Sequence, residues 1–249
     1  MSRPMLLLAA ALVLVATACG GRATGSPQEV ILVSAASSLT DSFAGIESAF
    51  ESANPGVDVV VNLAGSSVVR EQILEGAPAD VFAPADSASM ELVVAAGGAE
   101  APQGFATNQL SIAVPAGNPG NVKALDDFAD AGRLIGLCAA GVPCGDLARA
   151  ALDQAGVTAA TDTNEPNVRA LLTKVEAGEL DAAIVYVTDV AASQVVSGVE
   201  IPAAVNVTTT YPIAVTTGGP NPDGAARFVA FVLSADGQAI LARHGFGTP

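Results

Sequence analysis

The chain has 249 residues, with 25 Asp and Glu against 10 Lys and Arg, a formal net charge of −15 and 51% hydrophobic residues. So few basic residues cannot form the positive face on which nucleic-acid binding depends, and they also disfavour anionic membrane surfaces. Charged residues make up 14% of the chain, while the apolar share is high, which argues against disorder. The length is sufficient for one large hydrophobic core or two modest ones.

The first 18 residues have the pattern of an export signal. Arg3 precedes a mostly apolar run that is short for a membrane-spanning helix and is typical of a secretory signal peptide. Ala16 and Ala18 stand before Cys19, which resembles a bacterial lipoprotein cleavage site and implies a lipid anchor on Cys19. An ordinary cleaved signal with an incidental cysteine is the alternative. In both cases we expect an exported protein outside the cytoplasm. If Cys19 carries lipid, that anchor is the only contact with the membrane that we expect.

Residues 19–29 are rich in Gly, Ser and Pro without apolar periodicity, and predict a flexible tether. Short apolar runs then alternate with amphipathic stretches, a pattern typical of an α/β fold. The predicted strands are 31–36, 57–64, 79–85, 109–116, 133–138, 181–187 and 211–217.

Helical spacing of apolar residues marks two stretches, one with Leu39, Phe43, Ile46 and Phe50 and the other with Val168, Leu171, Leu172 and Val175. Residues 223–246 predict one or two further helices. A strand count near nine would make a very wide single sheet, so we expect two α/β lobes. The predicted division is a signal peptide (1–18), a tether (19–29), a first lobe (30–107), a second lobe (108–210) and a return to the first lobe (211–249).

Several predicted strands are followed by helix starts that suit an anion. Ser38 and Ser66 come directly after the first two strands, where a serine hydroxyl caps a helix and free backbone N–H groups attract negative charge. Plain capping is the alternative for either serine alone. Because parallel strands present their carboxyl ends at one edge of a sheet, where ligands bind, the two starts together favour a binding site.

Three further residues belong to the same candidate site. Cys144 and Val168 stand at later helix starts, where only their backbone N–H groups are available. Tyr186 ends the strand 181–187, from which its hydroxyl can reach a cleft, although a half-buried core aromatic residue is the alternative.

The sequence resembles the periplasmic molybdate-binding protein family, the solute receptors of molybdate ABC importers. The resemblance runs from about residue 30 to 246 and rests on the motifs SAASSLTDSF, LAGSSVVREQILEGAPADVFAPAD, GVPCG, PNVRALLTKVEAGELDAAIVYVTD, YPIAV and RHGF. It implies a two-lobed type II periplasmic binding protein, in which each lobe is a mixed sheet flanked by helices and the oxyanion lies in the cleft between the lobes.

The resemblance also implies the ligand set and the partners. Ser38 and Ser66 would bind through hydroxyl and backbone N–H, Cys144 and Val168 through backbone N–H, and Tyr186 through its hydroxyl. The ligand would be molybdate or tungstate, with no cofactor and no directly coordinated metal. We expect a monomer that delivers the anion to the permease and ATPase subunits of an ABC importer. The chain departs from the common family pattern at Ser37, Gly65 and Cys144.

A site built only from neutral donors is selective. It binds a dianion when its dipoles converge and water is excluded, and it disfavours a protonated phosphate, whose proton needs an acceptor. Sulfate has the same charge and shape as molybdate and is smaller, so a receptor for sulfate or another tetrahedral oxyanion is the alternative function. Lobe closure would hinge on the two chain crossings at 107–112 and 208–212.

Cys138 and Cys144 are six residues apart in an exported chain, which favours a disulfide over two free thiols. An exported hydrolase is the rival class, but the sequence offers it little. The only histidine is His244, there is no G-x-S-x-G motif, and no metal-ligand cluster is evident. Asp80 and Asp86 fit local capping better than a catalytic acid pair. We therefore expect a protein that is not an enzyme.

Overall fold

The structure is a computed structural model that describes residues 28–249. The predicted signal peptide, the Cys19 anchor and most of the predicted tether lie outside the described residues. The first strand begins at Glu29, at the end of the segment that we expected to be a tether.

Within the described residues, nine strands form a mixed sheet system in the order β2-β1-β3-β9-β4-β7-β5-β6, with β8 also paired to β4. The pairs of β1 with β2 and β3, and of β5 with β6 and β7, are parallel, whereas β4 and β9 pair antiparallel with their neighbours. The strands are β1 (Glu29–Ala36), β2 (Val57–Ala64), β3 (Val81–Ala83), β4 (Ala99–Pro115), β5 (Ile135–Cys138), β6 (Thr163–Glu165), β7 (Ala182–Tyr186), β8 (Val196–Glu200) and β9 (Thr208–Thr216).

Helices flank both halves of this system. They are η1 (Ser37–Leu39), α1 (Thr40–Ala53), α2 (Ser66–Leu74), α3 (Ser87–Ala95), η2 (Leu125–Ala129), α4 (Pro143–Ala155), α5 (Val168–Glu176), α6 (Val187–Ala192), α7 (Pro222–Leu233) and α8 (Ala235–Arg243), where η marks a 3-10 helix. Both stretches with helical spacing are helices whose periodic residues are buried. The segment 223–246 contains two helices, α7 and α8.

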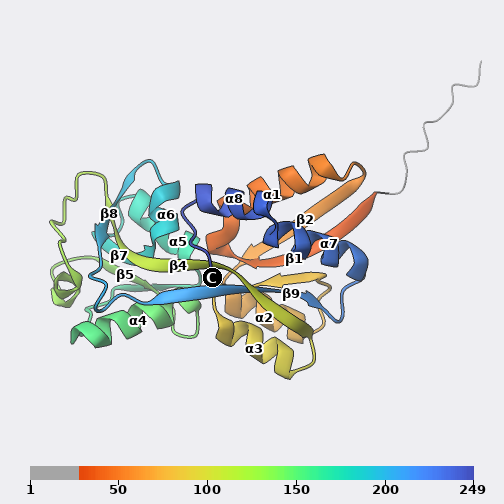
Figure 1. The fold of residues 1–249 in the computed structure, drawn as a ribbon. Helices are drawn as coiled ribbons and strands as arrows, with labels where there is room; N and C mark the ends of the chain where they lie inside the picture. The colour runs from red at the N-terminus through yellow and green to blue at the C-terminus, as the bar shows by residue number, and fades with distance from the viewer. Residues whose placement is uncertain (1–27) are drawn as a thin grey trace, which may run out of the picture.

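Buried apolar residues gather on either side of a junction crossed by β4 and β9. One core contains β1, β3, β9, α1, α7 and α8, with a smaller cluster under α2 and α3 on the other face; we call this part the first lobe. A second core contains β5, β7, η2, α4, α5 and the end of β4, and we call it the second lobe. Figure 1 shows β4 and β9 side by side along the middle of the molecule, reaching from one lobe to the other. The predicted α/β fold with two lobes is confirmed.

Strand β4 takes part in the sheets of both lobes. Residues 107–109 of β4 pair with 210–208 of β9, while the next residue, Leu110, lies opposite Tyr186 of β7. The expected crossings at 107–112 and 208–212 therefore lie in two adjacent antiparallel strands. This arrangement places Tyr186 at the junction of the lobes.

Two features of the sheet differ from the sequence prediction. β4 begins at Ala99 instead of residue 109, and Pro102, which has no N–H to donate, lies where its pairing shifts register between Glu100 and Gln103. β6 and β8 were not predicted, because they are short, partly exposed strands without apolar alternation.

In residues 28–249, no single helix is long and apolar enough to cross a membrane; the bent pair α7 and α8 passes that test by length and composition alone.

Candidate functional site: an anion cavity between the lobes

A small cavity lies where the two lobes meet, and all five predicted ligand residues line it. Its empty volume is about 190 Å³, part of which opens to solvent. The first lobe contributes Ala36, Ser37, Ser38, Gly65, Ser66 and Ala85, and the second lobe contributes Val142, Pro143, Cys144, Asn167, Val168 and Tyr186. None of these lining residues carries a full charge at neutral pH.

Three helices that begin at this cavity have no side-chain cap, whereas α5, which also begins there, is capped by Asn167. The N-cap residues of η1, α2 and α4 are Ala36, Gly65 and Val142, and none of them caps its helix through a side chain. Elsewhere, α3, α7 and α8 are capped by an Asp, Asn or Ser side chain. The uncapped starts leave first-turn backbone N–H groups without a side-chain acceptor where these helices meet the cavity. This arrangement favours an anion.

The Tyr186 hydroxyl is a buried donor of the cavity that the described residues leave without a partner. Tyr186 is 1% exposed, and its Oη has no hydrogen-bond partner among the described residues. A buried polar group without a partner costs about 1–3 kcal/mol. Burial raises the pKa of this phenol well above its ordinary value of 10.0, and the nearby Tyr211 and Asp189 raise it further. The hydroxyl therefore stays protonated and is available to donate.

The Ser38 hydroxyl is oriented by a short chain of hydrogen bonds. Ser38 Oγ lies 2.9 Å from Tyr211 Oη, and the Asn108 side-chain amide donates to the same Tyr211 oxygen at 3.4 Å. Because the amide N–H is a donor, Tyr211 accepts from Asn108 and can direct its own proton to Ser38. The Ser38 proton is then free to point into the cavity.

The Ser66 hydroxyl is arranged in the same way. Its oxygen accepts a hydrogen bond from the Ala85 backbone N–H at 3.0 Å. The Ala85 carbonyl accepts from Thr209 Oγ1 at 2.7 Å, which fixes the backbone at this point. Because one of its lone pairs is engaged by Ala85, the Ser66 hydroxyl can turn its proton toward the cavity.

The loop that presents the Cys144 N–H is fixed on several sides. Cys138 and Cys144 form a disulfide with Cα atoms 5.8 Å apart, in agreement with the sequence-based expectation. Arg149 donates to the carbonyls of Cys138 and Gly145 at 2.9 and 2.8 Å. Pro143 has no N–H, so Cys144 is the first residue of α4 that can donate to the cavity.

The second lobe supplies a further helix start at Val168. Asn167 caps α5 by accepting from the Ala170 N–H at 2.9 Å, which holds the turn before the helix. The N–H groups of the first turn are a preferred location for an anion.

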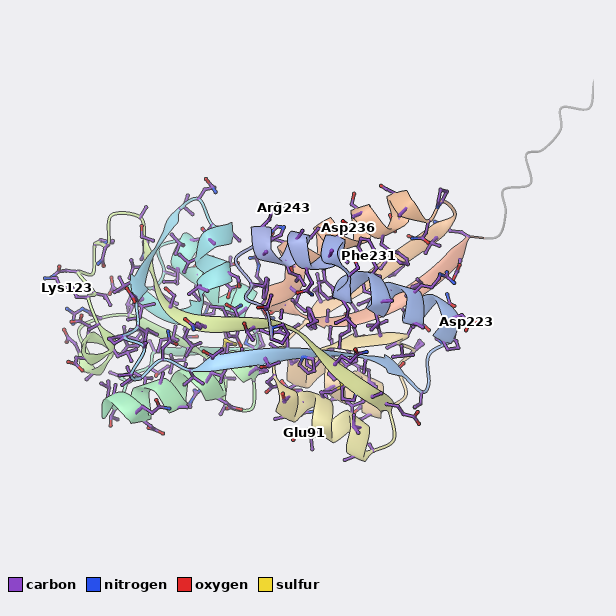
Figure 2. The ribbon with its side chains drawn as sticks, viewed as in Figure 1. Glu91, Lys123, Asp223, Phe231, Asp236 and Arg243 are labelled. Atoms are coloured by element: carbon purple, nitrogen blue, oxygen red, sulfur yellow. A yellow bond between two sulfur atoms is a disulfide. The ribbon has the colours of Figure 1, made fainter. Side chains whose placement is uncertain are left out.

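Charged residues surround the cavity without entering it. Arg169 of α5 binds Asp41 of α1 at 3.1 Å, which links the two lobes. Asp189 of α6 accepts from the Tyr186 N–H at 3.0 Å, but its second oxygen has no partner among residues 28–249. Burial raises the pKa of Asp189 to about 7, while the Tyr186 hydrogen bond and the Arg169 charge oppose this shift. In Figure 2 the labelled Glu91, Lys123 and Asp223 lie on the outer surfaces of the two lobes.

The residues considered for catalysis have structural partners. Asp80 accepts from the backbone N–H groups of Leu32 and Asn221 at 2.7 and 2.6 Å, and Asp86 caps α3. His244 is the C-cap residue of α8 and lines a second cavity together with Ser38 and Ser42. Both serine hydroxyls already have partners, since Ser38 contacts Tyr211 and Ser42 donates to the Leu39 carbonyl. Among the described residues, no group of His, Cys, Asp and Glu is arranged to hold a metal ion.

Asn108 and Tyr211, which we did not predict from the sequence, form the hydrogen-bond chain that orients Ser38. Tyr211 packs between Tyr186 and Phe246, with ring centroids 6.1 and 5.5 Å away, and it is fully buried. It belongs to the YPIAV motif, but its contact with Ser38 joins residues 173 positions apart. The pairing of β4 with β9 brings Asn108 to Tyr211, and the sheet order β1-β3-β9 brings Ser38, which follows β1, to the same ring.

A two-lobed fold with an uncharged cavity of converging donors defines a class of solute-binding receptor. In agreement, the family model described as bacterial extracellular solute-binding protein matches residues 31–247. The molybdate-binding protein ModA of Mycobacterium tuberculosis (strain ATCC 25618 / H37Rv) is 38% identical over 252 residues, which cover 98% of this chain and 97% of that protein. The chain therefore belongs to the molybdate-binding family of bacterial extracellular solute-binding proteins.

Two solved structures share the fold. The periplasmic molybdate-binding protein of Azotobacter vinelandii has a TM-score of 0.78 at 22% identity, covering 88% of this chain and 99% of that chain. The sulfate-binding protein SubI of Mycobacterium tuberculosis H37Rv has a TM-score of 0.75 at 18% identity, covering 88% and 86%. At these identities the similarity establishes the type II periplasmic binding fold alone.

Proposed function

We propose that the protein captures molybdate, and also tungstate, between its lobes and delivers it to the permease and ATPase subunits of an ABC importer. The observation that carries this proposal is the buried Tyr186 hydroxyl, which stays protonated and lacks a partner in a cavity of neutral donors. Membership of the molybdate-binding family supports the identity of the anion. The protein acts as a receptor and not as an enzyme.

In the proposed complex each lobe supplies part of the donor set. Ser38 and Ser66 donate from the first lobe through hydroxyl and backbone N–H groups. Cys144 and Val168 donate backbone N–H groups from the second lobe, and Tyr186 donates its hydroxyl. Hydrogen bonds to a charged acceptor are worth about 1.5–3 kcal/mol each, so five residues suffice to hold a dianion without a basic side chain.

Isothermal titration calorimetry of the mature protein tests this function with molybdate, tungstate and sulfate as separate ligands. We expect saturable binding of molybdate and tungstate with similar affinity, and much weaker binding of sulfate. Molybdate at a hundredfold excess over its dissociation constant should stabilise the protein by about 2.7 kcal/mol in thermal unfolding. No binding of molybdate would reject the proposal, and comparable binding of sulfate would favour the general oxyanion receptor instead.

The location of the protein is a separate part of the proposal. We propose that lipid on Cys19 anchors a monomeric receptor on the outer side of the cell membrane. Cys19→Ala should move the protein from the membrane fraction to the soluble exported fraction, while its affinity for molybdate in calorimetry stays unchanged. Retention of Cys19→Ala in the membrane fraction would contradict the lipid anchor.

A further inference from the structure

The two lobes come close to each other at Gly65, which lines the cavity. A Cβ atom added to Gly65 would lie 2.5 Å from the Pro166 carbonyl oxygen and 3.5 Å from the Asn167 Cβ. Gly65 precedes Ser66 at the start of α2, and Pro166 and Asn167 precede Val168 at the start of α5. The contact therefore forms one wall of the cavity.

The backbone conformation gives no other reason for a glycine at this position. Gly65 has φ −59° and ψ 139°, a combination that any residue adopts. What excludes a side chain at this position is the lack of space between residue 65 and the Pro166 carbonyl oxygen. We propose that Gly65 sets how closely the lobes approach each other over the anion, and thereby determines the affinity of the site; this inference rests on the proposed function.

Both sides of the contact are held by their own hydrogen bonds. The Gly65 carbonyl accepts from the Val68 and Val69 N–H groups at 2.9 and 3.1 Å, which binds it to the first turn of α2. On the other side, the Asn167 carbonyl accepts from Leu171 at 3.2 Å, and its side chain accepts from Ala170 at 2.9 Å. A local shift would break these bonds, so an added methyl group separates the lobes instead.

The size of the separation decides its effect on binding. A carbon and a carbonyl oxygen pack at about 3.3 Å or more, so the added Cβ pushes residue 65 and Pro166 apart by roughly 0.8 Å. A hydrogen bond of about 2.9 Å then lengthens to about 3.7 Å, beyond bonding distance. Because the donors come from both lobes, the anion cannot keep all of them. The Arg169–Asp41 ion pair, which joins the lobes at 3.1 Å, lengthens in the same movement.

The test compares Gly65→Ala with Gly218→Ala, a matched control in which the added methyl group meets nothing within 4 Å. Calorimetry with molybdate should give at least a tenfold weaker affinity for Gly65→Ala, the loss of about one hydrogen bond to a charged ligand. Gly218→Ala should bind within twofold of the wild-type protein. Gly65→Ala should unfold in urea at the wild-type concentration without ligand, because parting the lobes relieves the contact.

Three results would overturn the inference. These are molybdate affinity of Gly65→Ala within twofold of wild type, an equal loss in the control variant, or a marked loss of stability without ligand. Failure of the wild-type protein to bind any oxyanion would instead reject the proposed function. Crystal structures of both proteins with molybdate then test whether the added methyl group separates the lobes. The shortest distance between residue 65 and the Pro166 carbonyl should be larger in Gly65→Ala than in wild type. An equal distance would reject the separation.

Discussion

Replacing Tyr186 with Phe should raise the free energy of unfolding measured without ligand and, at the same time, lower the affinity for molybdate. The Tyr186 hydroxyl is buried without a partner among the described residues, so its removal should relieve a cost of about 1–3 kcal/mol when no ligand is bound. In the proposed complex the same hydroxyl donates to a dianion, a bond worth about 1.5–3 kcal/mol. Both effects lower the affinity, so the dissociation constant for molybdate should rise tenfold or more.

The matched control is Tyr211→Phe, which removes a hydroxyl from the adjacent ring. Tyr211 Oη contacts Ser38 Oγ at 2.9 Å, so its loss leaves the serine without a partner and should destabilise the unliganded protein. The two variants are therefore expected to change unliganded stability in opposite directions. Urea unfolding without ligand and calorimetry with molybdate measure the two quantities separately.

The stability changes of the two variants, measured without ligand, test the role of each hydroxyl. If Tyr186→Phe lowers the free energy of unfolding as Tyr211→Phe does, the Tyr186 hydroxyl has a partner in the unliganded protein. If in addition the affinity for molybdate stays within twofold of wild type, Tyr186 is not a ligand.

Three further predictions concern stability. Because the folded-state pKa of Asp189 is raised from 3.8 to about 7, its contribution to stability is fully present below pH 4 and is lost as the pH rises to 7. The loss is on the order of 4 kcal/mol, so Asp189→Asn should flatten unfolding free energies across this range, and an unchanged slope would contradict it. Ser66→Ala leaves the buried Ala85 N–H without its acceptor and should cost about 1–3 kcal/mol in urea unfolding, whereas Ser67→Ala should cost less. The double variant Cys138→Ser, Cys144→Ser opens a short loop and should lose about 2 kcal/mol, and no loss relative to the oxidised protein would contradict this.

The fold was largely predictable because it depends on local periodicity. The apolar spacing in α1 and α5 and the strand β2 match the structure closely. The start of β4 was wrong by ten residues, because Pro102 and Gly104 indicate a loop when the sequence is considered alone. In the structure, register shifts in the pairing with β9 accommodate both residues. Pairing with a distant strand is a tertiary effect that local sequence does not contain.

The residues that line the site were predictable, whereas their supports were not. Ser38, Ser66 and Cys144 stand at strand-to-helix junctions, which local sequence identifies. The contacts that orient their protons come from residues far along the chain, such as Tyr211 for Ser38 and Ala85 for Ser66. The close approach at Gly65 is likewise visible only when the two lobes are placed together.

The acidic composition and the anion site are compatible because the site depends on local dipoles. At physiological salt, charges more than about 8 Å apart are largely screened, so the net charge of −15 has little effect inside the cavity. The Ser66 oxygen accepts from the Ala85 N–H and the Ser38 oxygen can accept from Tyr211, so both hydroxyls can direct their protons into the cavity. No carboxylate lines the cavity among the described residues, so a protonated phosphate would find no charged acceptor for its proton. The same arrangement that makes basic residues unnecessary therefore favours fully deprotonated oxyanions.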